Sequence, residues 1–143
     1  MTDHRQLGVD LFNHVWTLLE KADRTAAEDD EMLHASHASR YHWAQVGTPA
    51  NSARGEWLCS RVYTVLGRAE PAVHHARRCL ELCEANGIGD WDLAFAHEAL
   101  ARAHALAGDH EQADRHKRLA RSAGNAIADP EDREHFDEDF ATL

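Results

Sequence analysis

The amino-acid sequence predicts an all-α protein made of antiparallel helix hairpins, on three observations. Its 143 residues fit a single domain and include only three prolines and eight glycines, the residues that most often interrupt helices. Apolar residues recur at three- and four-residue intervals, and capping residues separate these periodic stretches. A repeat of 41 residues relates the later part of the chain to itself.

The first predicted hairpin covers residues 3–46. Asp3, or the threonine before it, can cap a helix whose apolar residues continue in helical spacing to Ala22. The string TAAE, which starts at Thr25, has the form of a capping box that satisfies two free backbone N–H groups. A second helix therefore follows and ends before Gly47, a residue that suits the left-handed stop of many helices.

The second predicted hairpin covers residues 48–86. Its opening TP places a threonine cap before Pro49, whose missing N–H costs nothing at the first position of a helix. This helix runs to Leu66, and Pro71 again lies near the start of the next one. An asparagine followed by Gly87 then forms another stop signal.

The third predicted hairpin covers residues 90–125 and is followed by a last helix over residues 129–142. Asp90 can cap the first helix of this hairpin, which ends at Gly108. Asp129 precedes a proline and a run of acidic residues that favour the positive end of the helix dipole. The last helix carries its apolar residues on one stripe, formed by Phe136, Phe140 and Leu143.

The second and third hairpins repeat each other. A shift of 41 residues superposes RVYTVLGRAEPAVHHARRCLEL on RAHALAGDHEQADRHKRLARSA. The identical pairs are Arg61/Arg102, Gly67/Gly108, Glu70/Glu111, Ala72/Ala113, His75/His116 and Arg77/Arg118. One further step back aligns His34 with His75 and His116. Such repetition is typical of arrays in which each hairpin buries its remaining apolar face on the next.

The strings LGRAEPAVHHARRCLEL and AGDHEQADRHKRLA resemble the centre of a tetratricopeptide repeat. Each has a glycine at the inter-helix turn, an acidic residue three positions later, and two small residues, Ala72 and Cys79 or Ala113 and Ala120. Tyr63 and His104 occupy the usual aromatic position. The period departs from the 34 residues of the family, and its usual proline is absent. The resemblance implies a TPR-like right-handed superhelix of about three hairpins with a C-terminal capping helix.

The resemblance also implies a function, which is to bind a protein or peptide in the concave groove formed by the first helix of each hairpin. The residues it places there are Arg54, Trp57, Arg61, Thr64, Phe95, Glu98 and Arg102. Arginine forks beside aromatic rings suit the carboxylates of an acidic segment. Alternatively, these arginines pair with the chain's own aspartates and glutamates. If they bind a partner, Arg61→Glu should abolish capture and leave the melting temperature nearly unchanged.

A stripe of histidines on the second predicted helix suggests a different class of function. His34, His37 and Tyr41 lie on one face, and with His42 or His75 they could bind a divalent transition metal or a small ligand, as in an enzyme. No second ligand motif accompanies the stripe. The recurrence of histidine at one repeat position instead favours a packing role, in which case no cofactor is expected.

Composition disfavours several other classes of function. A formal net charge of −10 disfavours nucleic-acid and anionic membrane partners. Apolar segments are short and interrupted by charge, no secretory signal is visible, and three cysteines make no even disulfide framework. We therefore expect a cytoplasmic protein, with homodimerisation through the concave face as a variant of partner binding. No phosphate-binding loop, G-x-S-x-G elbow or C-x-x-C pair predicts an enzyme.

Overall fold

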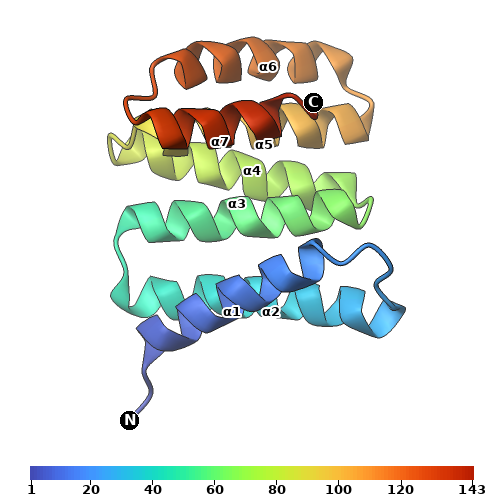
Figure 1. The fold of residues 1–143 in the computed structure, drawn as a ribbon, viewed down its shortest axis with the longest axis vertical. Coiled ribbons are helices and arrows are strands. Elements are labelled where there is room, and N and C mark those ends of the chain that lie inside the picture. The colour runs from blue at the N-terminus through green and yellow to red at the C-terminus, as the bar shows by residue number, and fades with distance from the viewer.

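The computed structural model describes every residue of the chain and contains seven α-helices and no β-strand (Figure 1). The all-α prediction is therefore confirmed. No helix combines the length and the apolar character that a membrane crossing requires. In chain order the helices are α1 (His4–Leu19), α2 (Ala26–Val46), α3 (Pro49–Val65), α4 (Ala69–Ala85), α5 (Asp90–Ala107), α6 (His110–Asn125) and α7 (Pro130–Phe140).

The first six helices form hairpins that are stacked in chain order, α1/α2, α3/α4 and α5/α6 (Figure 1). The backbones of the first helices approach one another in turn, α1 with α3 and α3 with α5, whereas the backbones of α2, α4 and α6 do not. The helices α1, α3 and α5 therefore share one face of the stack. Figure 1 shows α7 lying in front of α5, with which it is in contact.

Several helices begin at the predicted capping residues. Thr25 and Glu28 form the reciprocal capping box, in which Glu28 N–H donates to Thr25 Oγ1 at 3.2 Å and Thr25 N–H donates to Glu28 Oε1 at 3.0 Å. Asp3 and Asp129 accept backbone N–H groups in the first turns of α1 and α7. These bonds join residues only two or three positions apart, so the local sequence suffices to predict them.

Gly47 does not adopt the left-handed conformation predicted for it. Its φ of −89° and ψ of −178° are extended, which leads the chain into the extended Thr48 that precedes Pro49. Glycine is needed here for space, because an added Cβ would lie 2.8 Å from the Trp43 carbonyl oxygen and 2.9 Å from Asn51 Cβ. Close packing and the coming proline therefore end α2, without a left-handed residue.

Asp90 does not cap α5, because Gly89 occupies the cap position. Asp90 is the first residue of the helix and has a φ of 52°. Its Oδ1 accepts a hydrogen bond from Ala128 N–H at 3.0 Å, which ties the start of α5 to the segment between α6 and α7. The sequence predicted that the Asp90 side chain caps its own helix, but this side chain instead binds a backbone N–H group 38 residues away in the chain.

Helix α1 ends at Leu19 and so is shorter than the predicted helix, which reached Ala22. Beyond this end, Arg24 Nη1 donates to the carbonyl oxygens of Leu18 at 3.1 Å and Lys21 at 2.9 Å. The guanidinium satisfies carbonyl groups that a continuing helix would have bonded, so the chain can turn toward α2.

The two repeated hairpins make equivalent contacts at positions 41 residues apart. The turn glycines Gly67 and Gly108 both have left-handed φ values, 74° and 80°. In each hairpin a histidine of the second helix stacks on a ring of the first, His75 on Tyr63 at 5.5 Å and 7° and His116 on His104 at 5.9 Å and 5°. The sequence repeat thus corresponds to a structural repeat over α3–α6.

Helix α7 packs on the last hairpin through Phe136, which is fully buried. The ring lies in a small cluster with Ala94 of α5, Ala120 of α6 and Ile127. Gly124 of α6 leaves room for it, since an added Cβ there would collide with the Phe136 ring. This contact fixes α7 on the face shared by the first helices and so places its acidic residues beside them.

Candidate ligand-binding groove

A hollow of about 680 Å³ opens on the face formed by α1, α3, α5 and α7. Aromatic residues from all of these helices except α7 line it, together with arginines from α3 and carboxylates from α5 and α7. We call this hollow the groove and define it by its lining residues, Phe12, Trp16, Glu20, Arg54, Trp57, Arg61, Cys79, Trp91, Asp92, Phe95, Asp132, His135, Glu138, Asp139 and Thr142.

Aromatic rings form a continuous row across the face. Trp16 of α1 stacks on Trp57 of α3 with ring centroids 5.9 Å apart, and Trp57 meets Phe95 of α5 edge to face at 5.9 Å. Phe95 in turn contacts Trp91 at 6.3 Å and the buried Phe136 at 5.2 Å. Trp57 Nε1 is buried without a hydrogen-bond acceptor. The row gives the groove an apolar lining that is held by ring-to-ring packing.

Arg54 is held in the groove by two interactions. Its Nε and Nη2 donate to the two carboxylate oxygens of Asp92 at 3.0 Å and 3.1 Å, a bidentate pair that joins α3 to α5. Its guanidinium also lies 4.4 Å from the ring centroid of Trp91. The charge of Arg54 is therefore neutralised within the chain.

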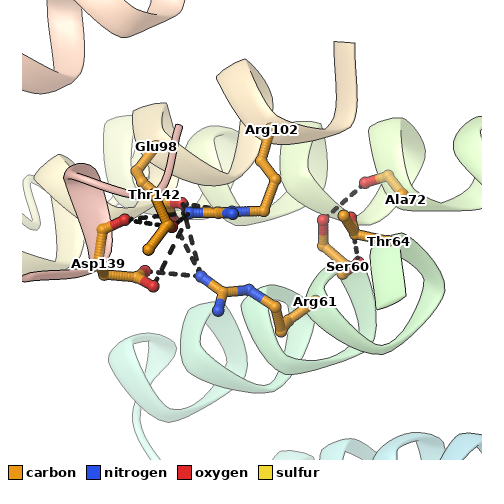
Figure 2. Close-up of polar contacts among 8 residues, drawn as sticks. All are labelled: Ser60, Arg61, Thr64, Ala72, Glu98, Arg102, Asp139 and Thr142. Atoms are coloured by element: carbon orange, nitrogen blue, oxygen red, sulfur yellow. Dashed lines mark hydrogen bonds and ion pairs between the residues drawn. The ribbon is translucent and has the colours of Figure 1, made fainter. Parts of the chain in front are cut away.

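Arg61 and Arg102 share a buried carboxylate, as Figure 2 shows. Glu98 is fully buried and accepts from Arg102 Nε at 2.7 Å and from Arg61 Nη2 at 3.5 Å. Arg61 Nη2 also donates to Asp139 of α7 at 2.6 Å, and Arg102 Nη2 donates to Thr142 Oγ1 at 2.7 Å. The network joins α3, α5 and the end of α7.

Burial raises the pKa of Glu98 above its ordinary value, although Arg61 and Arg102 act in the opposite direction. The Arg61 side chain is only 15% exposed, so it is a structural ion-pair partner and not a free surface cation. We therefore expect Arg61→Glu to lower the melting temperature, in place of the unchanged value expected from the sequence. A glutamate there would face the carboxylates of Glu98 and Asp139.

Four of the seven residues predicted for the concave face line the groove, namely Arg54, Trp57, Arg61 and Phe95. Glu98 lies beneath it, Arg102 holds Glu98 and the end of α7, and Thr64 donates to the Ser60 carbonyl oxygen at 2.9 Å.

The sequence interpretation missed Trp16 and the acidic residues of α7. Trp16 precedes Trp57 by the same 41 residues as the repeat, a signal that could have identified it. The acids gave no such signal, because α7 is outside the repeat.

The residues of the predicted histidine stripe are divided among different contacts. His42 Nδ1 lies 2.9 Å from His4 Nδ1, and Tyr41 is 60% exposed at the surface. His37 and His75 do meet, with ring centroids 5.2 Å apart, whereas His34 is exposed on α2. No group of three or more histidine, cysteine, aspartate or glutamate residues is arranged so that it could hold a metal ion.

His37 and His75 belong to a polar cluster between α2, α3 and α4. His37 Nε2 lies 2.9 Å from the Tyr63 hydroxyl, and His75 Nδ1 lies 2.6 Å from Glu56 Oε2. Burial lowers the pKa of His37. Burial acts to raise the pKa of Glu56, but the hydrogen bond from His75 and the charge of Arg40 outweigh it, so the pKa of Glu56 lies below its ordinary value. The cluster satisfies buried polar groups within the hairpin interface.

The equivalent positions of the next hairpin hold three histidines. His116 Nδ1 lies 3.2 Å from His97 Nδ1, and its ring stacks on His104. Burial is the main cause that lowers the pKa of all three, and nearby charge on His97 and Arg115 helps to lower that of His116 to about 4. Glu84 beside His97 and Asp109 beside His104 act in the opposite direction.

We expect acid to destabilise the protein through His116. Its pKa is lower in the folded than in the unfolded state, so its contribution is present above about pH 6.5 and is lost as the pH falls toward 4. Because the ring keeps some contact with solvent, we expect the loss to be about 1–2 kcal/mol. Urea unfolding at neutral and acidic pH should show a smaller pH effect in His116→Gln than in the exposed control His110→Gln. Equal pH effects in the two variants would contradict this role.

Comparison of the chain with protein-family models, with curated proteins and with solved structures gave no match.

Proposed function

We propose that this protein is a tetratricopeptide-like binding module that holds a segment of a partner protein in the groove. The observation that carries the proposal is the aromatic row of Trp16, Trp57 and Phe95 along a hollow of about 680 Å³. Such a volume falls within the usual range of ligand sites, and aromatic residues are the common anchors of protein interfaces. The groove is therefore suited to an inserted apolar side chain.

Two further observations support a binding module of this family. The turn and stacking contacts of α3/α4 recur in α5/α6 at 41-residue spacing, as expected for a helical repeat array. The two arginines of the groove are already paired within the chain, Arg54 with Asp92 and Arg61 with Asp139. The faces of the aromatic rings are therefore the part of the groove that a partner would contact.

A selection from a peptide library displayed on phage would test the proposal. Selected peptides should bind Trp91→Ala at least about tenfold more weakly than the natural chain, because this variant removes a groove ring. Tyr41→Ala, which removes an exposed aromatic residue from α2 outside the groove, should bind the peptides unchanged. Circular dichroism would verify that both variants stay folded. Peptides that bind all three proteins equally would overturn the assignment of the groove.

A further inference from the structure

The charged residues of the groove are predominantly acidic. Its lining includes two arginines, Arg54 and Arg61, against five carboxylates, Glu20, Asp92, Asp132, Glu138 and Asp139. Asp92 and Asp139 pair with the arginines, as described above. The remaining three carboxylates, of Glu20, Asp132 and Glu138, have neither an ion-pair partner within 4.0 Å nor a side-chain hydrogen bond. The groove therefore presents uncompensated negative charge beside its aromatic rings.

An acidic partner would have to compete with the chain itself. The 2.6 Å contact between Arg61 Nη2 and Asp139 Oδ2 already gives this arginine a carboxylate from α7. Arg54 holds Asp92 with both of its donors, in a geometry that leaves little for a second carboxylate. An incoming carboxylate would lose its hydration, break these pairs and face the free carboxylates of Glu20 and Glu138.

We propose that the partner segment is basic, with a lysine or arginine beside the apolar side chain that enters the groove. This inference depends on the proposed binding function and reverses the acidic preference expected from the sequence. Free carboxylates at the groove attract a cation, and the formal charge of −10 adds a long-range field of the same sign. Charge complementarity thus selects the partner, and the aromatic row provides its apolar contact.

The aromatic rings are chemically suited to such a side chain. Within the chain, guanidinium groups already lie against groove indoles, Arg54 at 4.4 Å from Trp91 and Arg61 at 5.0 Å from Trp57. Glu20 follows Trp16 by four residues, a spacing that brings side chains to the same side of a helical segment. A cation near Trp16 would therefore have an aromatic ring and a carboxylate within one helical turn.

Two matched peptides would test the inference. One is a short, terminally blocked peptide of lysine, leucine and phenylalanine, and the other has every lysine replaced by glutamate. By titration calorimetry we expect the lysine peptide to bind at least about tenfold more tightly. Indole N–H signals in NMR spectra should shift for Trp16, Trp57 and Trp91 and stay in place for Trp43, which is outside the groove.

Two double variants of equal net charge would locate the attraction. The first double variant combines Glu20→Gln with Glu138→Gln, and the control combines Glu81→Gln with Glu134→Gln. The first should reduce the affinity for the lysine peptide several-fold more than the control, because only Glu20 and Glu138 line the groove. Equal weakening would assign the effect to overall charge and overturn the inference. Tighter binding of the glutamate peptide, with the same indole shifts, would overturn the basic preference and keep the binding function. Absence of indole shifts with either peptide would overturn both.

Discussion

Replacing Arg61 by glutamate is expected to destabilise the fold by about 3–5 kcal/mol, the usual cost of breaking a buried ion pair. Arg61 is one of two cations that hold the fully buried Glu98, and it also holds Asp139 of α7. The substitution would place three carboxylates close together, those of the new glutamate, Glu98 and Asp139, where the natural chain has a guanidinium between two carboxylates. Arg102 alone would then compensate Glu98.

Urea unfolding at neutral pH would measure this loss. The matched control is Arg78→Glu, because Arg78 forms an exposed pair with Glu81 on α4 and should cost less than about 1 kcal/mol. Arg61→Ala adds a pH test. Glu98 held by Arg102 alone should bind a proton more readily, so the stability deficit of this variant should shrink in mild acid. If Arg61→Glu were as stable as the Arg78 control, Glu98 would not depend on this ion pair.

Replacing Phe136 by alanine is expected to cost about 3–5 kcal/mol, as for other fully buried aromatic residues. Phe136 is the one buried residue of α7, so the rest of this acidic helix has few other apolar contacts to hold it in place. We therefore expect α7 to detach locally from α5 and α6. Detachment would take Asp139 from Arg61 and remove one wall of the groove.

Hydrogen exchange would separate this local effect from global unfolding. Amides of α7 should exchange much faster in Phe136→Ala, whereas those of α3 and α4 should keep most of their protection. Leu119→Ala removes a partly exposed leucine of α6 and should change stability by less than about 0.5 kcal/mol. Unchanged protection of α7 would show that the polar network of Asp139 and Thr142 holds the helix without Phe136.

Both variants act on α7, which couples the stability of the fold to the chemistry of the groove. The helix brings the carboxylate that neutralises Arg61 and contributes Asp132 and Glu138 to the lining. A change that releases α7 would thus free an arginine and remove acidic residues together. Under the proposed binding function, the position of this one helix would therefore set the preference of the groove for basic or acidic segments.

The helices, their order and the 41-residue repeat could be predicted from the sequence alone. Caps such as Thr25 and turn glycines such as Gly67 and Gly108 act through residues a few positions away, so their effects follow from local spacing. The resemblance to tetratricopeptide repeats implied that α3 and α5 contribute to a groove, and Arg54, Trp57, Arg61 and Phe95 do line the hollow described here.

The charge of the groove and the contacts of the histidines could not be predicted in this way, because they depend on how the helices pack. A sequence gives the number of acids but not the distance between Arg61 and Asp139, which are 78 residues apart in the chain and 2.6 Å apart in space. Likewise, His34, His37 and His42 share a helix, yet neighbouring helices give them different surroundings. Electrostatic and hydrogen-bonding energies depend on such distances and on burial, and these are fixed only when the helices pack.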